Sequence, residues 1–159
     1  MNAIISFLIF TSLAISQPVV EENNQMPVKE SIFITMERTP CFGKCPSYKI
    51  TIFNTGNVVY EGLQFAEKQG KFSKKLDKNE LSELKEQLEL LNIFALKDTY
   101  DSKITDIPSC ILLINYKEKK KKILDRDGAP EELKKFEKLI DALVITKDLK
   151  KEDEGKGKG

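Results

Sequence analysis

The sequence predicts an α+β domain, in which a mostly antiparallel sheet of about five or six strands carries two amphipathic helices on one face. Three observations lead to this class. Strand-like runs follow one another through short connections before the first helix and again before the second, and such succession favours antiparallel pairing. Two longer stretches repeat their apolar residues at helical spacing. Their opposite faces are charged, so each helix is expected to cover the sheet with one side only.

Alternation of apolar and polar residues predicts the strands before the first helix. The runs 31–37, 48–53 and 58–65 each alternate with a period of two, and 70–75 is a weaker fourth strand. The turn Asn-Thr-Gly-Asn at 54–57 joins the second and third strands, because glycine and asparagine tolerate the positive φ that tight hairpins need.

Start signals and apolar stripes define the two helices. The first begins at Asp77, where Asp77 and Glu80 have the spacing of a capping box. The second begins at Pro130, and Glu131 and Glu132 suit the positive end of its dipole. The residues expected to pack on the sheet are Leu81, Leu84, Leu88 and Leu91 in the first helix, and Leu133, Phe136, Ile140 and Leu143 in the second.

The segment between the helices contains an irregular stretch and then two strands. Residues 97–108 show no periodicity, whereas 110–116 is nearly continuous in apolar residues and is therefore expected to be central in the sheet. The lysine-rich residues 117–122 form a turn and a strand edge that leads into Ile123 and Leu124. Charge on such an edge discourages pairing with other chains.

Length, charge and the amino end indicate the class of protein and its compartment. The chain has 159 residues, a length that suits one domain. Its formal net charge of +1 lacks the basic excess that is typical of a nucleic-acid binder. Residues 3–15 form an apolar run that is too short to span a bilayer and suits a signal peptide, with cleavage before Gln17. A buried strand or a membrane anchor is the alternative for this run.

We therefore expect an exported, soluble monomer in the periplasm or outside the cell, with no membrane span after signal cleavage. The predicted organisation is a signal peptide at 1–16, a flexible leader at 17–30, a single domain at 31–146 and a disordered charged tail at 147–159.

Cys41 and Cys45 lie in a short loop together with two prolines and a glycine. In an exported protein, two cysteines four residues apart favour a disulfide over a metal site or a redox pair. Redox chemistry remains an alternative, as does a zinc site with Cys110 and a carboxylate, although the chain has no histidine. Cys110 is expected to be a free, buried, small hydrophobic residue.

Polar residues beside the cysteine loop and the irregular stretch are the candidates for binding. They are Arg38, Tyr48, Tyr100, Thr105 and Asp106. They either line a pocket, with Arg38 and Asp106 as the charged pair, or form a salt bridge and turn caps, and the structural interpretation is favoured. Phe42 and Lys44 in the loop complete the candidate set. No catalytic residue is assigned, since a chain without histidine cannot form a Ser-His-Asp or Cys-His arrangement.

Three motifs carry a resemblance to a known family. They are Glu37-Arg38-Thr39-Pro40-Cys41-Phe42-Gly43-x-Cys45-Pro46-x-Tyr48, then Val59-Tyr60-x-Gly62, then Thr105-Asp106-x-Pro108. With these motifs the chain resembles the uncharacterised bacterial domain-of-unknown-function family 6438 over residues 31–144. The resemblance implies a small, usually exported bacterial protein with no assigned activity and no established catalytic residues. The turn at 54–57 and Cys110 depart from the family pattern, so Cys110 is not expected to belong to a family site.

The leading interpretation is an exported, non-enzymatic module whose cysteine loop contacts another protein or an envelope component. One alternative is a thiol–disulfide redox enzyme that uses Cys41 and Cys45, and another is a secreted inhibitor that presents the loop to a protease. We expect no cofactor, no metal and no nucleic-acid partner.

Overall fold

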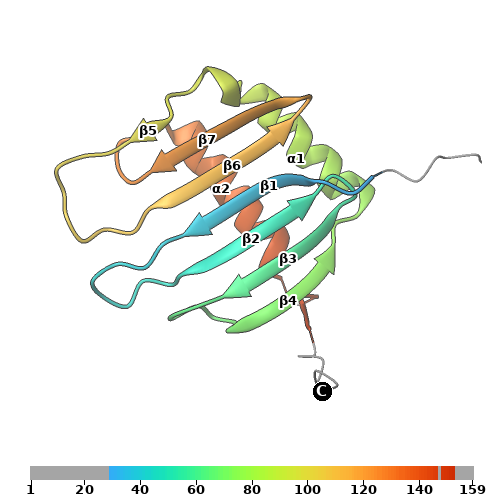
Figure 1. The fold of residues 1–159 in the computed structure, drawn as a ribbon, viewed down its shortest axis with the longest axis horizontal. Helices are drawn as coiled ribbons and strands as arrows, with labels where there is room; N and C mark the ends of the chain where they lie inside the picture. Colours follow the sequence, from blue (N-terminus) through green and yellow to red (C-terminus); the bar gives the residue numbers. More distant parts are fainter. Residues whose placement is uncertain (1–28, 147, 153–159) are drawn as a thin grey trace, which may run out of the picture.

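A computed structural model describes residues 29–146 and 148–152. These residues form one sheet with two α-helices packed against a single face (Figure 1). In chain order the elements are β1 (Ile32–Arg38), β2 (Tyr48–Phe53), β3 (Asn57–Gly62), β4 (Gly70–Lys75), α1 (Lys78–Leu90), the 3₁₀ turn η1 (Ile93–Ala95), β5 (Thr99–Tyr100), β6 (Cys110–Tyr116), β7 (Lys119–Asp125), α2 (Glu131–Val144) and β8 (Lys150–Lys151).

The sheet confirms the predicted α+β class but differs from it in detail. Its strand order is β5-β7-β6-β1-β2-β3-β4-β8, so it has eight strands where five or six were expected. All neighbouring strands are antiparallel except β5 and β7, which makes the sheet mixed. The added strands, β5 and β8, are two residues long, and so short a segment has no alternation from which a strand can be recognised.

β1 and β2 occupy the middle of the sheet, and β6 is an inner strand beside β1. β6 lies between β1 and β7, which confirms its predicted central position. Ile34 and Met36 of β1 and Leu112 of β6 are fully buried under the helices. β7 pairs with β5 only at Leu124 and Asp125. Its lysine-rich beginning therefore remains at the sheet edge, as the sequence indicated.

β3 ends earlier than predicted, at Gly62 instead of Phe65. A Cβ added at Gly62 would lie 1.7 Å from the Lys68 carbonyl oxygen. Only glycine permits the Lys68 carbonyl to approach the backbone at position 62 so closely. This close approach lets the chain turn out of the sheet after Gly62. Phe65 has a φ of 56° and so lies in the turn that leads to β4.

The two helices pack on the sheet through faces of different character. In α1 the Asp77 and Glu80 side chains form the predicted capping box, and Leu84 and Leu88 are fully buried. The α2 helix has Pro130 as its N-cap residue, without a side-chain cap. Its buried residues are Leu133, Phe136, Glu137, Ile140 and Val144, whereas the predicted Leu143 is partly buried.

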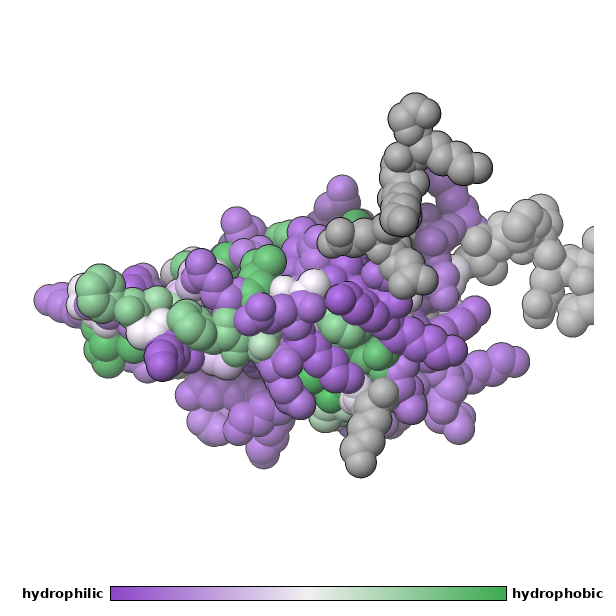
Figure 2. Space-filling view, turned by 90° about the horizontal axis from the view of Figure 1, so that it is seen from below, coloured by the Kyte–Doolittle hydropathy of each residue, from purple (hydrophilic) through white to green (hydrophobic). Residues whose placement is uncertain are grey.

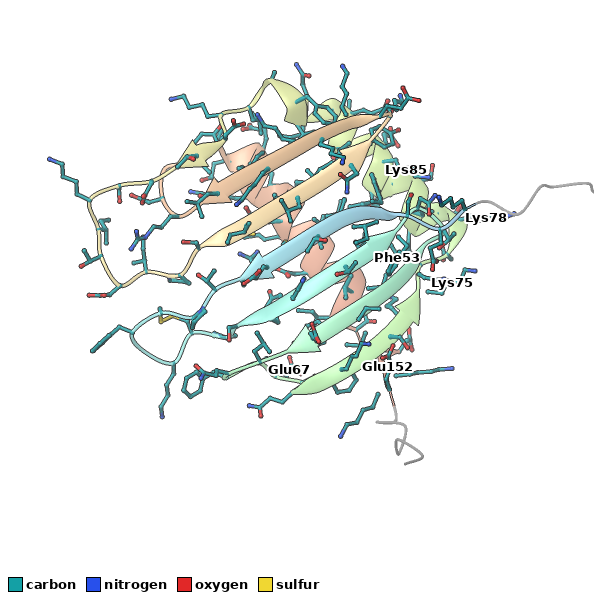
Figure 3. All side chains as sticks on the ribbon, in the orientation of Figure 1. Phe53, Glu67, Lys75, Lys78, Lys85 and Glu152 are labelled. Carbon is teal, nitrogen blue, oxygen red and sulfur yellow. A yellow bond between two sulfur atoms is a disulfide. The ribbon has the colours of Figure 1, made fainter. Side chains whose placement is uncertain are left out.

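Three loops lie together at one end of the molecule, which we call the loop end (Figure 1). They are the β1–β2 loop at 39–47, the β3–β4 loop at 63–69 and the β5–β6 loop at 101–109. The opposite end holds the start of α1, where Lys78 is labelled (Figure 3).

The predicted signal peptide, most of the leader and the last residues of the tail lie outside the described residues. Lys150 and Lys151 fall in the tail that was expected to be disordered, yet they pair with Ser73 and Phe72 of β4. Among the described residues, neither helix combines the length and the apolar character needed to cross a bilayer.

Candidate functional site

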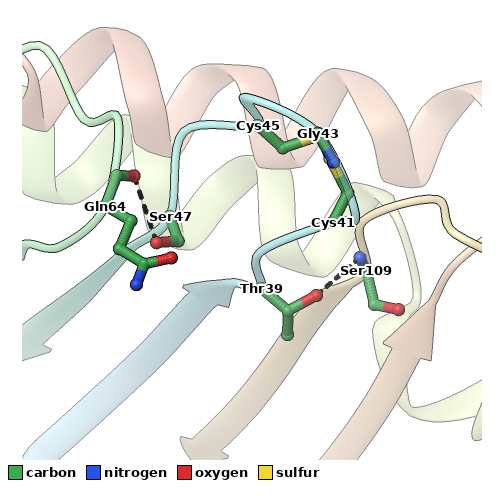
Figure 4. Close-up of a disulfide and its surroundings, with 7 residues drawn as sticks. All are labelled: Thr39, Cys41, Gly43, Cys45, Ser47, Gln64 and Ser109. Atoms are coloured by element: carbon green, nitrogen blue, oxygen red, sulfur yellow. Dashed lines mark hydrogen bonds between the residues drawn. A yellow bond between two sulfur atoms is a disulfide. The ribbon is translucent and has the colours of Figure 1, made fainter.

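The cysteine loop is closed by a disulfide between Cys41 and Cys45, whose Cα atoms are 5.5 Å apart. Hydrogen bonds tie one side of the loop to the β5–β6 loop (Figure 4). The Thr39 amide donates to the Ser109 carbonyl oxygen at 2.9 Å, and the Ser109 amide donates to Thr39 Oγ1 at 2.8 Å. The loop therefore leaves the sheet from a fixed base.

The other side of the cysteine loop is tied to the β3–β4 loop. The Ser47 amide donates to the Gln64 carbonyl oxygen at 2.8 Å, and the Leu63 amide donates to the Ser47 carbonyl oxygen at 2.9 Å. Ser47 Oγ donates to the same Gln64 oxygen at 3.2 Å (Figure 4). Because the loop is anchored on both sides and cross-linked, little conformational freedom is left for it to lose on binding.

Arg38, the last residue of β1, forms an ion cluster at the base of this loop. Its Nη2 lies 2.8 Å from Asp141 Oδ2, and its Nη1 lies 3.3 Å from Glu137 Oε2. The Tyr48 hydroxyl donates to Asp141 Oδ1 at 2.7 Å and accepts from Arg38 Nε at 3.0 Å. One guanidinium, one phenol and two carboxylates thus form a connected polar network above α2.

Strand register and helix spacing bring this network together. Arg38 is paired in the sheet with Tyr48 of β2 on one side and with Cys110 of β6 on the other. Glu137 and Asp141 are four residues apart on α2, so they lie on one face of the helix, one turn apart.

Burial controls the protonation of the two carboxyl groups beside Arg38 and Cys110. Glu137 is only 3% exposed, and this burial raises its pKa to about 7, against the opposing effect of Arg38 and with a further contribution from Asp125. Burial also raises the pKa of Asp125. Glu137 therefore changes charge near neutral pH, where ordinary carboxylates remain ionised.

The neighbouring hydroxyl, thiol and guanidinium groups are held in their protonated forms. Burial and the Asp141 hydrogen bond raise the pKa of Tyr48. Burial and the charge of Glu137 raise the pKa of Cys110. Burial opposes the charge of Arg38, but the neighbouring Cys110 and Asp141 outweigh it and raise the pKa of Arg38. A thiol with a raised pKa is a poor nucleophile.

A pocket of ≈ 350 Å³ opens between the cysteine loop, the β5–β6 loop and α2. Its walls are formed by Arg38, Cys45, Pro46, Tyr48, Pro108, Ser109, Cys110, Asp125, Arg126 and Glu137. The side chain of Arg38 is 27% exposed, so part of its guanidinium is accessible to solvent.

The predicted candidates divide into three groups. Arg38 and Tyr48 are brought together, and both line the pocket. Thr105 and Asp106 are exposed and are hydrogen-bonded to each other, and Arg38 pairs with α2 instead of with Asp106. The Arg38–Asp106 pair of the pocket interpretation, which the sequence did not favour, is not formed, because α2 places its two carboxylates against the end of β1.

The remaining candidates, Tyr100, Phe42 and Lys44, do not line the pocket. The Tyr100 carbonyl oxygen accepts from the Arg126 amide at 2.9 Å, which places Tyr100 in the β5–β7 pairing. Phe42 and Lys44 are exposed in the cysteine loop, where Phe42 is 92% exposed.

Sequence reasoning missed the acidic half of the site, Glu137 and Asp141, and the Asp125 and Arg126 walls of the pocket. A signal for Glu137 was available. It lies between Leu133 and Ile140 on the apolar stripe of α2, where a charged residue needs a partner. Asp141 follows it by one turn, whereas nothing in the sequence distinguishes Arg126.

The described residues hold no group of three or more Asp, Glu, Cys or His side chains suited to a metal ion. The pocket offers hydrogen-bonding and charged groups, and the loop offers an exposed apolar side chain.

Residues 32–144 match a family described as a domain of unknown function, DUF6438. The chain belongs to this family. The match covers everything from β1 to the end of α2 and includes the motifs that anchor the loop end. A search of curated proteins found no match.

Proposed function

We propose that this DUF6438 protein is an exported, non-enzymatic interaction module that binds a protein or an envelope component through its disulfide-closed loop. Phe42 is the observation that carries the proposal. Its ring is 92% exposed at the tip of a loop that is cross-linked and anchored on both sides. An exposed aromatic side chain on a rigid base gains contact area on binding at little cost in conformational entropy.

Neighbouring loops add apolar surface at the same end. Seven large apolar side chains are exposed in the described residues, and four of them lie on the loop end: Phe42, Leu63, Phe65 and Ile104. Figure 2 shows hydrophobic residues gathered at the end of the molecule that projects to the left, which is the loop end of Figure 1. Clusters of exposed apolar residues with polar surroundings are typical of interaction surfaces.

Export remains part of the proposal and is supported by the apolar run at 3–15 and by the disulfide, which persists in oxidising compartments. Redox catalysis lacks a comparable observation.

A photo-crosslinking amino acid at position 42 tests the proposal in the cells that produce the protein. We expect a discrete adduct with an envelope or extracellular component. The matched control carries the same amino acid at Lys78, which is exposed at the opposite end of the molecule (Figure 3). Adducts of the same pattern from both positions, or none from position 42, would contradict the proposal. Identification of a protease as the sole adduct would turn the module into an inhibitor.

A further inference from the structure

Two buried polar atoms have no hydrogen-bond partner in the described part of the chain: Glu137 Oε1 and Arg126 Nε. Both residues belong to the wall of the pocket between the cysteine loop and α2. The Cys110 thiol and the Asp125 carboxyl both lie close enough to Glu137 to affect its pKa, but neither makes a hydrogen bond to Oε1. Buried polar groups are nearly always paired, so an orphan acceptor and an orphan donor in one pocket indicate a missing polar occupant.

We propose that this pocket binds the carboxamide side chain of an asparagine or glutamine on a polypeptide partner. A carboxamide carries a donor and an acceptor in one planar group. Its NH₂ would donate to Glu137 Oε1, and its oxygen would accept from Arg126 Nε. Both orphan atoms are then satisfied by one neutral group.

Arg38 provides further donors for the carboxamide oxygen. Its hydrogen bonds to Tyr48, Asp141 and Glu137 use Nε and one proton on each of Nη1 and Nη2. A guanidinium has two protons on each Nη, so one remains on each nitrogen. Because Arg38 is partly exposed and lines the pocket, these protons are available to a ligand.

Charged ligands fit the pocket less well. A carboxylate would enter beside Asp125 and Glu137, which together offset the two arginines of the wall. An ammonium group would pair with Glu137 but would leave Arg126 Nε without an acceptor and would face two guanidinium groups. The pocket contains both signs of charge in equal number, so a neutral group with both hydrogen-bonding functions is the best match.

The pocket lies beside the cysteine loop that carries the proposed function. The inference that the carboxamide belongs to a polypeptide partner rests on that proposed function. Cys45 and Pro46 of the cysteine loop form one wall, and Pro108 and Ser109 of the β5–β6 loop form another. A polypeptide that covers Phe42 therefore passes next to the pocket and can place one side chain inside it.

Protonation gives the proposal a directional test. The groups that face Glu137 are Arg38 from β1, Cys110 from β6 and Asp125 from β7, besides the ligand site itself. The pKa of Glu137 is about 7, and the ionised carboxylate accepts a hydrogen bond from a ligand N–H more strongly than the protonated carboxyl group does. Carboxamide binding should therefore strengthen as the pH rises from about 6 to about 8. A carboxylate ligand would show the opposite dependence.

The experiment is a titration of the ¹⁵N-labelled, oxidised protein with N-acetyl-L-glutamine methylamide, followed at the arginine Nε–Hε resonances. We expect a saturable shift of the Arg126 resonance, which disappears from the spectrum of Arg126→Lys. The glutamate and norvaline analogues of the probe serve as ligand controls and should bind at least about tenfold more weakly at pH 8.

Glu137→Gln is the decisive variant. The amide oxygen of the new side chain can still accept from Arg38 Nη1. The amide NH₂ then takes the place of Oε1, so a donor replaces the unpaired acceptor and faces the NH₂ group of the probe. We expect at least about a tenfold loss of affinity. Glu132→Gln, an exposed change on the same helix, should leave binding unchanged. Arg126→Lys keeps the charge but removes Nε, so it provides a second loss of binding should Glu137→Gln fold poorly.

Equal binding of the carboxamide and norvaline probes would overturn the proposal, as would tighter binding of the glutamate probe or unchanged affinity in both pocket variants. No shift at all would mean that the orphan atoms hold an ordered water only, which also overturns it. A failed titration beside a successful crosslink from position 42 removes the pocket assignment and leaves the proposed function in place.

Discussion

The two helices cover the same face of the sheet and are nearly equal in length, yet they pack on it in different ways. α1 buries leucines and leaves its glutamates at the surface, where Glu89 contacts Tyr116 and Lys117. α2 buries Glu137 among its apolar residues and pairs it with Arg38. α1 thus stabilises the fold by hydrophobic packing. Part of the buried face of α2 instead forms a polar network beside the cysteine loop. A buried charge is costly unless it is paired, so such a position indicates a functional role more strongly than the apolar helix does.

The largest expected effect on stability comes from the apolar packing of α1. Leu88→Ala in α1 should lower the free energy of unfolding by about 2–5 kcal/mol, because it leaves a cavity under the sheet. Urea denaturation measures the change. Leu90→Ala, at an exposed position of the same helix, should stay within about 0.5 kcal/mol. A loss below about 1 kcal/mol for Leu88→Ala would mean that α1 does not belong to the core.

On the polar side, Arg38→Met should destabilise the protein by about 3 kcal/mol at pH 8, because Glu137 and Asp141 lose their cation while largely buried. The same denaturation assay applies. The control is Lys134→Met, which breaks a surface pair with Glu131 on α2 and should cost about 0–1 kcal/mol. Equal losses for the two variants would show that the network is no stronger than a surface ion pair.

The disulfide should contribute less than either packing region. Replacing both Cys41 and Cys45 by serine should cost about 2 kcal/mol, since the closed loop is short and its removal frees little chain entropy. Non-reducing mass spectrometry should find these two residues linked, with Cys110 free and slow to alkylate in the folded state. Ready exchange with glutathione, together with thiol-oxidase turnover, would favour the redox alternative over a structural cross-link.

The smallest expected effect is a pH dependence of the stability that comes mainly from Glu137 of α2. The folded pKa of Glu137 is raised to about 7 from an ordinary value of 4.5, so the native state holds a proton that the unfolded chain has released. Its contribution to stability is complete below pH 4.5 and is lost as the pH rises towards 7. We expect a loss of about 1–2 kcal/mol over this window.

Glu137→Gln is the test of that pH dependence. Its stability should fall less than that of the wild type over the same window, and the remaining fall should come from Asp125, whose pKa is also raised. Parallel stability profiles for the wild type and the variant would show that Glu137 titrates normally.

Local patterns in the sequence determined the strands, the helices and the cysteine loop. Alternation located β1 and β2, a nearly continuous apolar run located β6, and the Asp77–Glu80 spacing fixed the start of α1. These features depend on neighbours within a few residues, so they can be recognised without the fold. The export context also indicated the disulfide, because two cysteines so close in sequence have few other partners.

Only the tertiary structure decided which residues form the site. Arg38 lies 99 residues from Glu137 and 103 from Asp141 in the sequence, and no local rule selects α2 over Asp106 as its partner. The choice follows from the crossing of α2 under the end of β1, which the packing of the whole apolar face sets. The sequence by itself determined the elements and the rigid loop, and the tertiary structure decided that a buried carboxylate, two arginines and that loop enclose one pocket.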